Sequence, residues 1–175
     1  MPSIFTNGVV RIRLIVSFLT VTWLGLATLS SALAHFADVL QNRAKSDLAN
    51  ANYFMLDITL QKLMSDTLIT MVITALISAM LSIFGILILV HPRWIQEDCK
   101  ARVYYGCMSF LLSLPVVTIG GCVAGGIHGL QSSFELLDRD GSFPYYVVMY
   151  YGAVGQAAFG AAVVILILIH FVAAI

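Results

Sequence analysis

Charge is scarce in this sequence. Only 10% of its 175 residues are charged, and nine basic residues balance nine acidic ones. Soluble domains carry about 25% charged residues, and proteins that bind nucleic acid usually carry a basic surplus for the phosphate backbone. Because 60% of the residues are apolar, the expected partner is the lipid bilayer and not nucleic acid.

Charge is absent altogether from four apolar windows of the chain. A helix needs about 20 apolar residues to cross the hydrocarbon core of a bilayer, and these windows predict transmembrane helices at about 14–34, 67–90, 103–127 and 145–173. The expected fold is therefore all-α: a polytopic membrane protein, one domain over residues 1–175, with four transmembrane helices in an up-down-up-down bundle.

The first window has a second interpretation. Arg11 and Arg13 precede it and Ala32-Leu33-Ala34 ends it, which is also the pattern of a signal peptide with its cleavage site. The apolar run is about 20 residues, longer than the 7–15 of a usual signal peptide. A retained helix is favoured, and cleavage after Ala34 stays open.

Basic residues predict the orientation in the membrane. Short cytoplasmic loops are enriched in Lys and Arg, and the amino-terminal tail and the 91–102 loop together hold five such residues against four in the other two loops. We therefore expect both termini in the cytosol, with the protein in the plasma membrane or an endomembrane.

The outer segment 35–66 is long for a connection, and such segments are usually functional or partly structured. Apolar residues recur in it at steps of three and four, which predicts an amphipathic helix. This helix either continues a membrane helix or lies on the outer interface. Ser65 and Asp66 are the expected N-cap of the second membrane helix.

Cysteine is missing from both outer loops, 35–66 and 128–144. This excludes the extracellular disulfides of tetraspanin-like and claudin-like proteins. Cys107 and Cys122 lie inside the third window and are expected to be buried. Cys99 lies in the inner loop beside basic residues, where S-palmitoylation is common; an unmodified thiol is favoured, and palmitoylation is the alternative.

No Asp, Glu, Lys or Arg lies inside the four windows. Such residues mark ion paths and proton relays, so a proton-coupled carrier, a voltage sensor and an acid–base enzyme are all disfavoured. The deepest polar residue is Gln156, in a run of small residues that ends at Gly160. A Gln in lipid usually forms a hydrogen bond across a helix interface, which is the role expected of it.

Small residues predict how the helices pack. Gly121 and Gly125 form a GxxxG pair, and Ala153, Ala157 and Ala161 form a matching stripe in the fourth window. Close backbone approach holds membrane helices together, so the third helix is expected to pack against the fourth. Gly121 and Gly125 could equally form the contact of a homodimer.

The third window also contains Pro115 near its middle. Proline removes one backbone hydrogen bond of a helix, and sharp bends usually lie at such positions. A kink is therefore expected there.

The four histidines allow one cofactor hypothesis. His35 and His128 lie at outer helix ends and His91 and His170 near inner ends, so that the bundle would place them as two pairs. Bis-histidine haem ligation in a membrane cytochrome needs such pairs. Three of the four border loops, where an interfacial His is common, so no cofactor and no metal are expected.

In length, helix count, inferred topology and an Arg-flanked first helix, the chain resembles the MARVEL-type four-helix membrane proteins. This resemblance implies a non-enzymatic role in membrane organisation, apposition or vesicle traffic, with other membrane proteins or further copies of the chain as partners. The alternatives are a small-solute transporter or channel formed by oligomerisation, and a b-haem redox protein.

Overall fold

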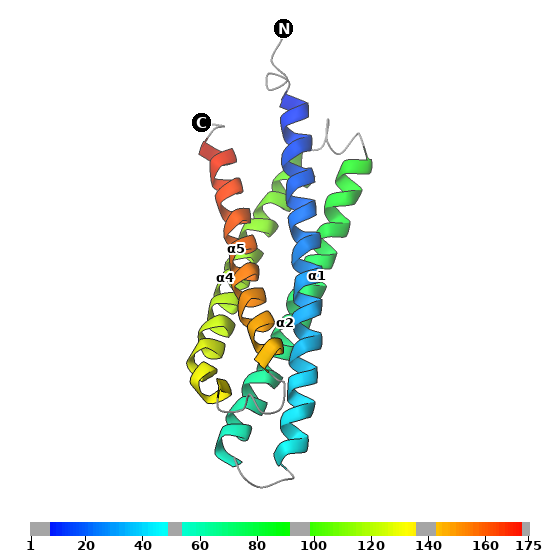
Figure 1. Ribbon diagram of the computed structural model, residues 1–175. Coiled ribbons are helices and arrows are strands. Elements are labelled where there is room, and N and C mark those ends of the chain that lie inside the picture. The colour runs from blue at the N-terminus through cyan, green and yellow to red at the C-terminus, as the bar shows by residue number, and fades with distance from the viewer. Residues whose placement is uncertain (1–7, 49–53, 92–98, 136–142, 173–175) are drawn as a thin grey trace.

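Four helices make up the described part of the protein (Figure 1). The computed structural model describes residues 8–48, 54–91, 99–135 and 143–172. The helices are α1 (Gly8–Leu48), α2 (Phe54–Val90), α4 (Cys99–Glu135) and α5 (Phe143–Val172). Each is long and apolar enough to cross a membrane. The expected all-α fold with four candidate membrane spans is confirmed.

The helices extend beyond the predicted windows. α1 continues to Leu48 and α2 starts at Phe54, so the described part of segment 35–66 consists of the ends of these two helices. The expected N-cap at Ser65 and Asp66 is wrong, because both lie inside α2 and the Asp66 carbonyl accepts a hydrogen bond from Thr70 Oγ1 at 2.9 Å. The windows measure only the lipid-immersed length, whereas backbone hydrogen bonding continues past it.

α1 passes through Ala34 without a break, and this residue is buried. Val16, Trp23 and Leu26, which precede it, are also buried. Cleavage after Ala34 would remove these core side chains and uncover their neighbours. The packing thus favours a retained first helix.

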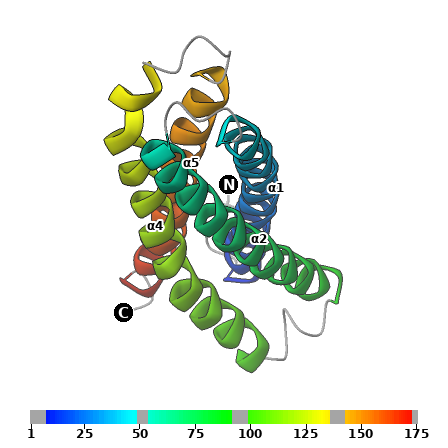
Figure 2. The same cartoon turned by 90° about the horizontal axis from the view of Figure 1, so that it is seen from below.

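Neighbouring helices run in opposite directions. Gly155 of α5 faces Leu29 of α1 and Gly152 faces Leu33, so residue numbers rise on one helix as they fall on the other. α1 packs mainly along α2, and α4 mainly along α5. Seen along the bundle, α1 lies beside α2, and α4 lies beside α5 (Figure 2).

Buried positions follow a heptad spacing, with alternating steps of three and four residues. This spacing is typical of left-handed helix bundles with knobs-into-holes packing. On α1 the positions are 16, 19, 23, 26, 30, 33, 37 and 40; on α2 they are 64, 67, 71, 74, 78, 81, 85 and 88; on α5 they are 146, 149, 153, 156, 160, 163 and 167.

The apolar core has two parts. One cluster draws on α1 from Leu33 to Leu40, and the other on α1 from Val16 to Leu26; both receive side chains from all four helices. Between them each helix contributes a segment that lies in neither cluster.

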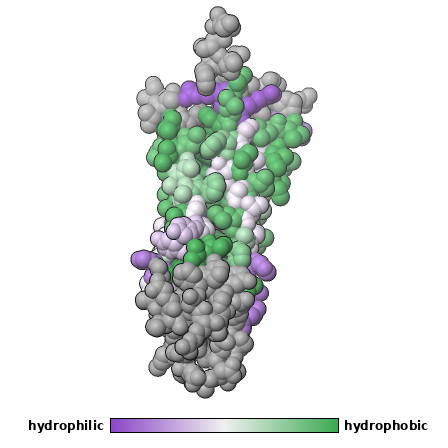
Figure 3. All heavy atoms as spheres, in the orientation of Figure 1, coloured by the Kyte–Doolittle hydropathy of each residue, from purple (hydrophilic) through white to green (hydrophobic). Residues whose placement is uncertain are grey.

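The outer surface is strongly apolar. Large aliphatic side chains are exposed along all four helices, and in Figure 3 they form a green band, with hydrophilic residues toward its ends. On α2 alone the exposed ones are Ile69, Val72, Ile73, Leu76, Met80, Ile83, Ile86, Leu87 and Val90. A soluble protein does not leave so large an apolar surface to water, so this band is the lipid-facing surface.

Candidate functional site

The interior of the bundle contains polar side chains among its apolar ones. The buried polar residues among those described are Thr20, Thr22, Ser30, Thr67, Thr74, Ser78, Ser82, Ser109, Ser113 and Gln156, all uncharged. Several hydroxyls donate to a backbone carbonyl of their own helix, as Ser82 does to Ser78 at 2.9 Å. The buried polar side chains thus lie within a mainly apolar core, while the outer surface of the bundle is apolar as well, unlike that of a water-soluble bundle.

A buried hydrogen bond joins α1 to α4. Trp23 Nε1 donates to Ser109 Oγ at 3.1 Å, and both residues are completely buried. Since an indole N–H can only donate, Ser109 supplies the acceptor that this buried group requires.

A second α1–α4 contact lies nearby and depends on a glycine of α2. The hydroxyls of Thr20 and Tyr105 lie 3.4 Å apart. A Cβ at Gly85 would collide with Thr20 Oγ1 and lie 2.6 Å from the Tyr105 hydroxyl. Gly85 therefore makes room for this pair of hydroxyls, which any larger residue would displace.

α4 and α5 touch through two glycines. A Cβ at Gly120 would lie 2.8 Å from the backbone nitrogen of Ala157 and 2.9 Å from the carbonyl oxygen of Ala153. A Cβ at Gly160 would lie 2.8 Å from Val117 Cγ2 and 3.3 Å from the Ser113 carbonyl oxygen. The expected packing of the third membrane helix against the fourth is present, with the close approach that small residues permit.

Gly121 and Gly125 do not take part in this contact. Both are exposed, and a Cβ at either would meet nothing within 4 Å. One residue along a helix is a rotation of about 100°, so Gly120 faces α5 while Gly121 faces outward. The intramolecular contact uses Gly120 and Gly160, and the assignment of Gly121 and Gly125 to it is corrected.

Further small residues are exposed on the outward side of α4. Gly129 continues the spacing of Gly121 and Gly125 and is equally open. Cys107 and Cys122 are also exposed on α4, so the expectation that they are buried is wrong. We call Gly121, Cys122, Gly125 and Gly129 the glycine face.

Gln156 is buried as expected, with a relative exposure of 0%. Neither its amide nitrogen nor its amide oxygen has a hydrogen-bond partner among the described residues. The expected hydrogen bond across a helix interface is therefore not formed. Heptad spacing places Gln156 at a core position of α5.

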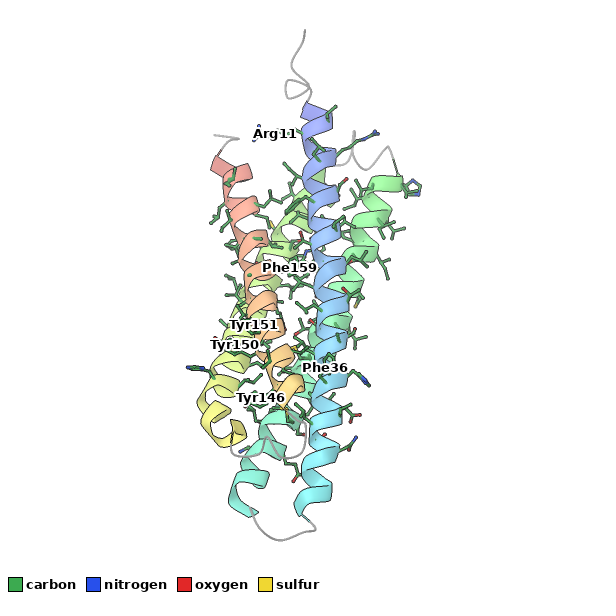
Figure 4. The ribbon with its side chains drawn as sticks, in the orientation of Figure 1. Arg11, Phe36, Tyr146, Tyr150, Tyr151 and Phe159 are labelled. Atoms are coloured by element: carbon green, nitrogen blue, oxygen red, sulfur yellow. The ribbon has the colours of Figure 1, made fainter. Side chains whose placement is uncertain are left out.

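Aromatic side chains gather where α5 begins. The Tyr146 hydroxyl donates to the Ile127 carbonyl at 3.0 Å and so ties α5 to α4. The rings of Tyr150 and Tyr151 meet edge to face, with centroids 5.3 Å apart. Figure 4 shows these tyrosines on α5 at the end of the bundle opposite Arg11. Interfacial aromatic residues commonly anchor membrane helices at this level.

The described histidine side chains face outward. His35, His91 and His128 are all exposed, whereas bis-histidine haem needs imidazoles that face each other inside the bundle. The side chain of His170 lies outside the described residues. No cluster of three potential metal ligands lies within the described ranges.

Two further predicted positions lie on α4. α4 begins at Cys99, whose side chain is outside the described residues, so palmitoylation stays a prediction. Pro115 lies inside α4 on its exposed side, and the Pro115 carbonyl accepts a hydrogen bond from Thr118 Oγ1 at 2.9 Å. The helix continues through it, and a kink there stays a prediction.

One set of buried polar residues on α2 was not recognised from the sequence, although its spacing gives a signal for it. Thr67, Thr74 and Ser78 are spaced by seven and four residues, which places them on one face of a helix. In an apolar window such a stripe indicates the side turned away from lipid.

Comparison with protein-family models, curated proteins and solved structures finds no match to this chain.

Proposed function

We propose that the protein is a non-enzymatic integral membrane component that acts through lateral contacts with other membrane proteins, a second copy of the chain first among them. The observation that carries this proposal is the glycine face of α4. Its three glycines recur every four residues and have open space where a side chain would be. In lipid, such faces let two helix backbones approach closely.

The chain itself uses this kind of contact elsewhere. Gly120, on the opposite side of the same helix, brings α4 within van der Waals distance of the α5 backbone. The glycine face offers an outside helix the same geometry. This supports a role in assembling or organising membrane proteins rather than in chemistry.

The resemblance to MARVEL-type proteins supports a role in membrane organisation, apposition or traffic. The uncharged interior of the described bundle fits such a role, because acid–base catalysis and proton coupling use ionisable groups. We place both termini in the cytosol. Arg11, Arg13 and Lys100 lie near the ends of α1 and α4 that share one end of the bundle (Figure 1).

Disulfide cross-linking through Cys122 tests this proposal. In a variant whose other two cysteines are replaced by Ser, oxidation in native membranes is expected to yield a covalent dimer. Gly125→Leu should reduce the dimer several-fold, because its side chain would hold the two backbones apart, while the isolated chain has room for it.

The matched control is a cysteine-free variant carrying Met80→Cys. Met80 is 71% exposed on α2, amid bulky aliphatic side chains. Equal dimer yields from Cys122 and from the cysteine at position 80 would contradict association through the glycine face.

A further inference from the structure

The middle of the bundle contains buried polar atoms without partners. Gln156, Ser30 and Ser78 each have a relative exposure of 0%. The Ser30 and Ser78 hydroxyls and both polar atoms of the Gln156 amide find no hydrogen-bond partner among the described residues. They come from three helices, α5, α1 and α2.

These three residues lie at one depth. Each lies between the nearest buried members of the two apolar clusters on its own helix: Ser30 between Leu26 and Leu33, Ser78 between Met71 and Leu81, and Gln156 between Ala153 and Val163. We call Ser30, Ser78 and Gln156 the middle layer.

Contacts between the helices also place these three residues at one depth. Gly155 of α5 faces Leu29 of α1, which puts Gln156 within about one helical turn of Ser30. Thr20 of α1 faces Gly85 of α2. Because these two helices are antiparallel, residue numbers rise along α1 toward Ser30 as they fall along α2 toward Ser78, which places the two serines within about one turn of each other. All three occupy heptad core positions, which turn toward the bundle axis.

The chemistry of this layer defines its ligand. The Gln156 amide offers two donor hydrogens and one acceptor oxygen, and each hydroxyl both donates and accepts. No described residue at this depth is both buried and charged, so an ion would lack a counter-charge. Buried polar groups in proteins are satisfied by protein or by ordered water, which makes about three hydrogen bonds per molecule.

We propose that Gln156, Ser30 and Ser78 form an internal binding site for a small uncharged molecule that both donates and accepts hydrogen bonds, with water as its smallest member. The site lies between the two apolar clusters, near the middle of the membrane-spanning length. It goes beyond the lateral contacts proposed above and does not depend on the glycine face.

Nuclear Overhauser effects from the Gln156 side-chain amide protons test this site. In protein purified in detergent micelles, these protons are assigned by the loss of their signal in Gln156→Met. Cross-peaks to water identify water as the occupant. Cross-peaks to carbon-bound protons of a co-purified molecule identify a neutral organic ligand, and either result supports the site. The Trp23 indole N–H, whose partner is Ser109, is the internal control and should show neither.

Thermal unfolding of the same variant gives a second readout. Methionine matches glutamine in length but cannot form the hydrogen bonds, so an occupied site predicts that the midpoint falls by roughly 2–5 °C. Ile167→Met, in the apolar cluster on the same face of α5, measures the cost of the methionine itself. If the site is empty, Gln156→Met removes a buried amide that has no partner, and the midpoint is expected to rise. A rise in the midpoint would overturn the proposal, and so would cross-peaks from Gln156 to protein protons alone.

Discussion

Gly120 and Gly121 are adjacent in α4 and have opposite surroundings. A Cβ at Gly120 would press on the backbone of α5, while one at Gly121 would meet open space. Because the obstructing atoms at Gly120 belong to a helix backbone and not to a flexible side chain, the contact can relax only by moving the helices apart. The two positions therefore form a matched pair for testing the packing of α4 on α5.

We expect Gly120→Ala to lower the free energy of unfolding by about 1–3 kcal/mol through overpacking. Gly121→Ala should be neutral or raise it by up to about 1 kcal/mol, because alanine is the better helix former and nothing opposes its methyl group. Thermal or denaturant unfolding in detergent measures both. Equal effects at the two positions would mean that α5 does not pack on the Gly120 face.

The Trp23 indole supplies a second test at this scale. Ser109→Ala removes the acceptor of its N–H in a completely buried setting. The expected loss of stability is about 0.6–2 kcal/mol, the range for hydrogen bonds between membrane helices and for buried groups left unpaired. Ser109→Thr, which keeps the hydroxyl, should recover part of that loss; no difference between the two variants would show that the hydrogen bond contributes nothing.

The sequence predicts how deep in the membrane a residue such as Gln156 lies, but not which helix or surface its side chain faces. Gln156 was placed inside the bundle, and it is buried there. Its lack of a partner depends on what the other helices present at the same depth, which one window cannot reveal. The GxxxG pair was found on α4, but the glycine that touches α5 is the one beside it, because small residues occur on several sides of this helix.

At the scale of helices, the four apolar windows correctly gave the number and approximate places of the spans. The ends were misjudged, most of all where α1 continues to Leu48. The hydropathy of the windows did not show which side of each helix is buried, because a window that is apolar on all sides gives little amphipathic signal. The buried stripe is marked instead by its hydroxyls and glycines, as at Thr74, Ser78 and Gly85 of α2.

The continuity of α1 leads to a prediction about processing. Since Trp23 and Leu26 fill the core and α1 makes the main contact with α2, we expect residues 1–34 to be present in the mature protein. Intact-mass measurement of protein purified from membranes checks this. A mature chain that starts at His35 would contradict the four-helix bundle itself.

At the scale of the whole molecule, the arrangement fixes which helix ends share a side of the membrane. The bundle brings the start of α1 and the end of α2 to one end (Figure 1). We expect that end to lie in the cytosol, because the amino-terminal tail and the 91–102 loop hold more basic residues than the other two loops.

Cysteine labelling in intact cells checks this orientation. In a cysteine-free background, a membrane-impermeant maleimide should label Asn42→Cys and spare His91→Cys, both of which replace exposed residues. Permeabilised cells, in which both should react, control for accessibility. Labelling of position 91 alone in intact cells would reverse the orientation.

The bundle is immersed in lipid with its large aliphatic side chains outside and its buried hydroxyls turned inward. A nitroxide scan along α2 from residue 67 to residue 90 in reconstituted bilayers tests this arrangement most directly, with collisions with oxygen reporting exposure to lipid. The account predicts high oxygen accessibility at exposed positions such as Leu76, Met80 and Ile83, and low accessibility at buried ones such as Thr74, Ser78 and Leu81. Uniform accessibility along α2, or maxima at Thr74 and Ser78, would contradict it.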